Sequence, residues 1–113
     1  MSPREVDQEL ERLRERYRDK FDRQLELLAE QLREAERARY GRPQLEAVRG
    51  LAHRLMGTSG SYGLETSSAA LARMEEQFEH LLAASEADAE AAAQAAWPGI
   101  ESELAAARAG VGR

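Results

Sequence analysis

The residue with the clearest potential for chemistry is His53, in a glycine-rich stretch that runs from Leu51 to Gly63. The residues that would form the buried face of a helix here recur at spacings of three and four: Leu45, Val48, Ala52, Leu55, Ser59 and Tyr62. At roughly 100° per residue, His53 points about 135° away from the centre of that face. An exposed neutral imidazole is a nucleophile that can accept a phosphoryl group.

Three glycines share the outer face of this predicted helix with His53, namely Gly50, Gly57 and Gly60. Each glycine inside a helix costs roughly 1 kcal/mol relative to alanine, so the three together cost about 2–3 kcal/mol. Nothing in the predicted core requires them. The pattern therefore indicates a surface cleared of side chains so that another molecule can approach the ring.

The segment His53-Arg54-Leu55-Met56-Gly57-Thr58-Ser59, followed by Gly63, resembles the signature of histidine phosphotransfer (HPt) domains. That signature reads His-x-Leu-Lys-Gly-Ser-Ser/Ala, with a later glycine at the end of the helix. The sequence departs from it at Met56, where the family usually has lysine. The resemblance implies a two-component phosphorelay protein that accepts a phosphoryl group on His53 from a receiver-domain aspartate or a histidine kinase. It would then pass the group to another receiver.

The resemblance also implies that the chain is a carrier rather than an enzyme, needs no cofactor, and leaves Mg²⁺ to the partner receiver. Gly57 and Gly60 would clear the docking surface around His53. Arg49 lies one turn before the histidine and could partly replace the missing lysine, while Arg54 is about 100° round the helix and a weaker candidate. Met56 could instead enlarge an apolar docking patch.

Other interpretations of His53 remain open. A degenerate HPt-like domain, or a structural helical adaptor, would bind partners without carrying phosphate. A histidine kinase dimerisation segment also carries a phosphorylated histidine, but an acidic residue follows it in that family and Arg54 follows here. A metal site is disfavoured because Arg49 and Gly57 occupy the positions four residues away. His80 lacks any such pattern, and we expect it to be an ordinary surface residue.

Composition limits the classes of protein further. The chain has 113 residues, no cysteine and a net charge of −5, which suits one cytoplasmic domain without disulfides. Residues 65–103 carry nine acids against Arg73 alone, whereas residues 40–64 are locally basic. Nucleic acid is a poor partner because it needs a broad basic footprint. No apolar run is long enough for a membrane span.

The spacing of apolar residues predicts helices throughout. The first begins at Ser2-Pro3 and ends near Gly41, as one helix of over 30 residues or two that break near Asp19 or Asp22. The second, from Pro43, carries His53. Thr66 or Ser67 would cap the third, and Ser85 would cap the fourth, which Pro98 should kink or interrupt.

Together these elements predict an all-α, antiparallel four-helix bundle with an additional or extended N-terminal helix. Residues 1–113 would form a single domain, divided into an N-terminal helical extension (1–20), the bundle (21–109) and a frayed tail (110–113). We expect Tyr62 and Trp97 to be aromatic residues of the core or its edge. The extension could leave the protein a monomer or support a weak dimer through the N-terminal helix.

Overall fold

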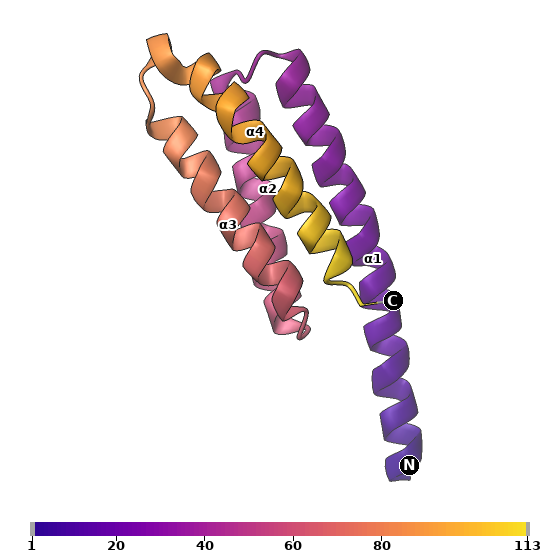
Figure 1. Cartoon of the computed structure of the whole chain (residues 1–113). Coiled ribbons are helices and arrows are strands. Elements are labelled where there is room, and N and C mark those ends of the chain that lie inside the picture. The colour runs from indigo at the N-terminus through magenta and orange to yellow at the C-terminus, as the bar shows by residue number, and fades with distance from the viewer. Residues whose placement is uncertain (1, 113) are drawn as a thin grey trace.

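The computed structural model describes residues 2–112, which form four helices and no strands (Figure 1). In chain order these are α1 (Pro3–Arg37), α2 (Arg42–Ser61), α3 (Glu65–Ala83) and α4 (Glu86–Ala109). Short loops join neighbours, so the helices run alternately up and down, and α1 packs against both α2 and α4 to close the bundle. The prediction of an all-α four-helix bundle is confirmed. Met1 of the predicted extension and Arg113 of the predicted tail lie outside the described residues.

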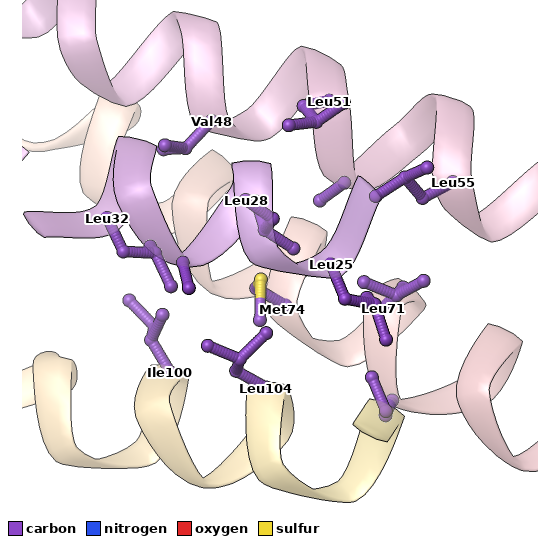
Figure 2. Packing of buried hydrophobic residues seen from close by; sticks show 14 of the residues in the cluster. Leu25, Leu28, Leu32, Val48, Leu51, Leu55, Leu71, Met74, Ile100 and Leu104 are labelled. Carbon is purple, nitrogen blue, oxygen red and sulfur yellow. The ribbon is translucent and has the colours of Figure 1, made fainter. Parts of the chain in front are cut away.

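One hydrophobic core fills the space between the four helices. Its members come from every helix and interdigitate along the bundle axis, as the labelled side chains show (Figure 2): Leu25, Leu28, Leu32, Val48, Leu51, Leu55, Leu71, Met74, Ile100 and Leu104. Burial of these apolar side chains is the main source of stability of such a bundle. The core also fixes the rotation of α2, which decides which of its residues face solvent.

Helix α1 is a single helix of 35 residues, without a break at Asp19 or Asp22. Ser2 caps it, since its hydroxyl accepts a hydrogen bond from the backbone N–H of Glu5 at 3.3 Å. Its first buried residue is Tyr17, and the part before Tyr17 extends beyond the end of the bundle (Figure 1). The molecule is therefore elongated, with extents of 63 × 20 × 19 Å.

The turn between α2 and α3 confirms one of the sequence-based predictions, the end of α2 at Gly63, and corrects another, the burial of Tyr62. Gly63 adopts a φ of +77°, and the N–H of Leu64 reaches the carbonyl of Ser59, so α2 ends in a Schellman motif. Tyr62 follows the last helical residue and is 51% exposed, not buried in the core. It stacks on Tyr17, with ring centroids 3.7 Å apart.

Helix α3 begins immediately after this turn, with Leu64 as its N-cap, so the predicted capping by Thr66 or Ser67 is wrong. Ser67 is instead fully buried, and its hydroxyl donates to the carbonyl of Ala107 on α4 at 2.7 Å. A Cβ atom at Gly110 would lie 2.6 Å from that hydroxyl oxygen. The start of α3 therefore requires a residue without a side chain at the end of α4.

Helix α4 runs through Pro98 without interruption, so of the two predicted effects of Pro98, a kink or an interruption, the interruption is wrong. Pro98 is exposed, so the backbone groups that lose their helical hydrogen bond remain next to solvent. Trp97 is buried as predicted, and its indole N–H donates to Glu36 on α1 at 2.6 Å. The expectation of a frayed tail is wrong at Val111, which is buried in the core cluster. Ser85 is the N-cap of α4 as predicted, although its hydroxyl donates to the Asp88 side chain.

Candidate functional site

His53 lies on the outer face of α2, with its side chain 60% exposed. On the opposite side of the helix, Leu55 and Ser59 are buried and fix the helix to the core. The Ser59 hydroxyl donates to the carbonyl of Met56 at 3.0 Å, so this buried polar group is satisfied within its own helix. The ring is therefore exposed on a backbone that the core holds in place.

The histidine ring is oriented by a carboxylate on the neighbouring helix. Nδ1 of His53 lies 2.7 Å from Oε2 of Glu75 on α3, and the Glu75 side chain is only 15% exposed. A carboxylate accepts hydrogen bonds, so Nδ1 carries the proton and donates it to Glu75. In the neutral ring this leaves the lone pair on Nε2, which has no hydrogen-bond partner among residues 2–112.

The glycines around His53 do not all have the same role. A Cβ atom at Gly57 would meet nothing within 4 Å, so the protein itself does not require glycine there. At Gly50 the nearest atom would be a guanidinium nitrogen of Arg54, 3.6 Å away. At Gly60, however, a Cβ atom would lie 3.3 Å from Oγ of Ser68, so this glycine also allows α3 to approach α2. The expectation that nothing inside the protein needs these glycines therefore holds best at Gly57.

Three further residues predicted for the site occupy the same stretch of α2. Met56 is half-buried and packs against the core, and its carbonyl also accepts a hydrogen bond from Ser68 on α3 at 2.9 Å. Arg49 is half-buried and makes no ion pair within the described part of the chain. Arg54 is exposed and directs its guanidinium along the helix toward Gly50.

Sequence reasoning missed Glu75, the partner of the His53 ring. Glu75 follows Met74 and lies beside the apolar stripe of α3, where one more acidic residue in an acidic helix carries no distinctive signal. His80, on the same helix, is exposed and has no hydrogen-bond partner among residues 2–112. Within the same residues there is no group of three or more potential metal ligands. No helix in this part of the chain combines the length and apolarity that a membrane span requires.

An exposed neutral imidazole on an open face of a helical bundle has the chemistry to accept a phosphoryl group. The chain belongs to the Hpt domain family, whose members are phosphocarrier modules, because the family model of the Hpt domain matches residues 4–110, which is nearly the whole chain. Comparison with curated proteins and with solved structures gave no match. The family supports a general role in phosphorelay by histidine phosphotransfer, through interaction with receiver domains or kinases.

Proposed function

We propose that His53 is the phosphorylated residue of this Hpt domain, and that it takes the phosphoryl group from an aspartyl phosphate of a receiver domain and passes it to another receiver. The observation that carries this proposal is the hydrogen bond between Nδ1 of His53 and Glu75, which leaves Nε2 free and exposed. A histidine kinase is an alternative donor for the same nitrogen. Experiment must identify which protein donates the phosphoryl group and which receiver accepts it.

In the proposed transfer, Nε2 attacks phosphorus as the bond between phosphorus and the aspartyl oxygen breaks. The carboxylate of the donor leaves, and the phosphorylated ring gains positive charge because Nδ1 keeps its proton. Glu75 lies 2.7 Å from that nitrogen and stabilises the charge as it develops. In the reverse direction a receiver aspartate attacks phosphorus, and His53 returns to the neutral ring.

The surface around His53 supports docking of a second protein. Gly57 leaves the face of α2 open beside the ring, so the active site of a receiver can reach Nε2. Arg49 and Arg54 supply positive charge close by, which favours an acidic pocket or a phosphoryl group. The transferring group spreads negative charge over its oxygens, and the receiver would hold Mg²⁺ against them.

Phosphoryl uptake tests this proposal directly. Purified protein is incubated with a panel of phosphorylated receiver domains, and separately with histidine kinases and ATP. We expect a label that is labile in acid and stable in base, as a phosphohistidine is. We expect no label on His53→Gln, which keeps a polar side chain on an exposed site.

His80→Gln is the matched control, because it changes another exposed histidine, on the neighbouring helix. It should take up label as the wild type does. Circular dichroism and thermal melting of both variants show whether the fold is intact. Label that persists in a folded His53→Gln variant would contradict the proposal. Absence of label with every donor, in a folded wild-type protein, would instead indicate a degenerate domain that binds partners without carrying phosphate.

A further inference from the structure

The part of α1 that precedes Tyr17 carries an apolar stripe that none of residues 2–112 covers. Val6, Leu10 and Leu13 belong to it, and Leu10 and Leu13 are 45% and 47% exposed. These residues continue the spacing of four and three that leads into Tyr17, where the same helix enters the core. A surface helix of a single domain normally turns such a stripe inward.

The stripe faces the end of the bundle rather than open solvent on the far side of α1. A groove lies between the stripe on α1 and the turn at the end of α2. It is lined by Leu10, Leu13, Arg14, Ser61, Tyr62 and Gly63. Tyr62, half-exposed and stacked on Tyr17, forms the bundle side of this groove. A second helix that covers the stripe would therefore lie beyond the end of the bundle, alongside the first part of α1, with one end against Tyr62.

The residues that flank the stripe are acidic along its first half and basic along its second half. Asp7 and Glu9 flank its first half, and Arg14 and Arg16 flank its second half. At about 100° per residue, Asp7 and Arg14 lie on one side of the stripe, and Glu9 and Arg16 lie on the other. An identical helix laid in the opposite direction, with Leu10 facing Leu13, brings Asp7 to Arg14 and Glu9 to Arg16 across both sides.

The existing ion pairs of this segment do not compete strongly with such an arrangement. Glu9 contacts Arg12, and Arg14 contacts Glu11, in exposed pairs along the helix surface. Pairs of this kind contribute little to stability and exchange readily. Asp7 and Arg16 make no ion pair with any residue from 2 to 112.

The shape of the molecule selects the antiparallel direction. Beyond Tyr17, α1 turns the same side to the bundle core, so a second helix running parallel on the stripe would run into the end of α2. An antiparallel helix avoids this collision because its own bundle lies at the opposite end. Its first turn, which begins at Pro3, then meets the first chain near Tyr62.

From these observations we propose that the occupant of the stripe is a second copy of this chain, bound through the segment Pro3–Tyr17 of α1 in an antiparallel pair. The pair has a twofold axis between Leu10 and Leu13. The contact is small, so association is reversible and belongs to the class of weak interfaces. His53 lies on α2, toward α3 and away from this interface, and stays accessible in both copies.

Sedimentation equilibrium from low micromolar to submillimolar concentration tests the proposal. We expect the average mass of the wild type to rise from one chain toward two, and the double variant Leu10→Glu/Leu13→Glu to remain a monomer throughout. Leu27→Glu is the matched control, because Leu27 is equally exposed (50%) but lies off the stripe on the bundle part of α1. A wild type that stays monomeric would assign the stripe to a different protein and overturn the proposal. An equal loss of association in Leu27→Glu would also overturn it.

Charge variants test the pairing itself. Asp7→Arg/Glu9→Arg makes all four flanking positions basic, and Arg14→Glu/Arg16→Glu makes all four acidic. Each variant alone should fail to associate, and an equimolar mixture should recover mixed dimers. Two dissociated variants that do not recover on mixing would contradict the proposed ion pairs.

Cysteine cross-linking tests the direction, because the natural chain has no cysteine. Leu10→Cys mixed with Leu13→Cys should form a disulfide between unlike chains under mild oxidation. Val6→Cys alone should not form one, since the two copies of Val6 lie at opposite ends of an antiparallel pair. Efficient disulfide formation by Val6→Cys would show a parallel pair and overturn the proposal.

Discussion

Two surfaces of this domain lie outside the core, and they are built in opposite ways. The segment of α1 before Tyr17 carries large apolar side chains that remain exposed. The outer face of α2 has an exposed histidine, with glycine at position 57 where a Cβ atom would meet nothing within 4 Å. Both belong to long helices anchored in the same core. Exposure alone therefore does not define a functional surface; the kind of side chain placed there does.

The comparison shows that the apolar stripe of α1 is stabilised when another surface covers it. The face of α2 around His53, in contrast, must stay open for its chemistry. Water excluded from Leu10 and Leu13 favours association. At His53 the exposed nitrogen needs access to phosphorus, and bulk beside it would prevent approach. Adding or removing side-chain bulk should therefore have opposite effects at the two surfaces. A change at one surface should leave the function of the other unchanged.

The largest effect after the complete loss expected for His53→Gln is predicted for Gly57→Leu. A Cβ atom at this position has no neighbour within 4 Å, and leucine is the better helix former, so the free energy of unfolding should rise by about 0.5–1 kcal/mol. The rate of phosphoryl uptake should fall by at least roughly tenfold, because the added bulk stands between the ring and its partner.

Thr58→Leu is the matched control for this change. Thr58 is exposed on the same helix but lies on another side, and its hydroxyl donates only to the carbonyl of Arg54 at 2.8 Å. Stopped-flow or quenched-flow transfer assays and chemical denaturation measure the two quantities. Unchanged transfer in Gly57→Leu would remove the distinction between the open and the covered surface.

A smaller effect is predicted for Glu75, which orients the ring. Glu75→Ala removes the acceptor for Nδ1–H and should slow phosphoryl transfer by several-fold to about tenfold. Glu75→Gln keeps an oxygen that accepts the same hydrogen bond and should recover part of the rate. The two rates are measured with one receiver donor at saturating concentration. Equal loss in both variants would show that charge rather than orientation is the contribution of Glu75.

A still smaller effect tests the independence of the two surfaces. Leu10→Glu/Leu13→Glu should leave the rate of phosphoryl uptake within about twofold of the wild type, because the stripe lies away from His53. In the same way, Gly57→Leu should leave the sedimentation behaviour unchanged. Reduced uptake in a folded stripe variant would show that the two surfaces are coupled.

The smallest effect concerns Tyr17, at the boundary between the exposed and buried parts of α1. Burial, together with the nearby Tyr62, raises the pKa of Tyr17 from 10.0 to about 12. Between these values the unfolded chain loses the phenolic proton and the folded chain keeps it, so stability falls as pH rises through this window. The Tyr17 hydroxyl has no hydrogen-bond partner among the described residues, so Tyr17→Phe should change stability little at neutral pH.

Urea denaturation at several pH values measures this effect. Above pH 10, Tyr17→Phe should lose less stability than the wild type, because it removes a group that loses its proton at lower pH in the unfolded chain than in the folded chain. Tyr40→Phe provides a comparison at the other end of the bundle, where burial also raises the pKa of the phenol. The same alkaline decline in wild type and Tyr17→Phe would contradict the assignment.

Much of the fold could be predicted from local sequence. The lack of glycine or proline between Arg4 and Arg37 agrees with the single long α1, although the sequence also allowed a break near Asp19 or Asp22, and Gly63 marks the end of α2. The outward direction of His53 also follows from helical spacing, and the structure confirms it. These features depend only on residues within a few turns of one another.

The features that were missed depend on contacts between helices or on the conformation of a single turn. The pairing of His53 with Glu75 requires the register of α2 against α3, which no local pattern contains. Tyr62 continues the apolar spacing of α2, but the helix ends at Ser61, so the spacing no longer describes its direction. Ser67 looks like a cap in the sequence, whereas its partner is the carbonyl of Ala107 on the last helix.

Trp97 gives this domain a built-in optical reporter. It is the sole tryptophan of the sequence, and it packs edge-to-face against Tyr40 and Phe78 at the end of the bundle where its indole N–H donates to Glu36. Tyr62 and the exposed stripe lie at the other end of the bundle, and His53 lies along α2 between the two ends. Its fluorescence emission should therefore shift when the bundle unfolds and stay constant during phosphoryl uptake or self-association. A single fluorophore thus separates loss of fold from loss of function in every variant.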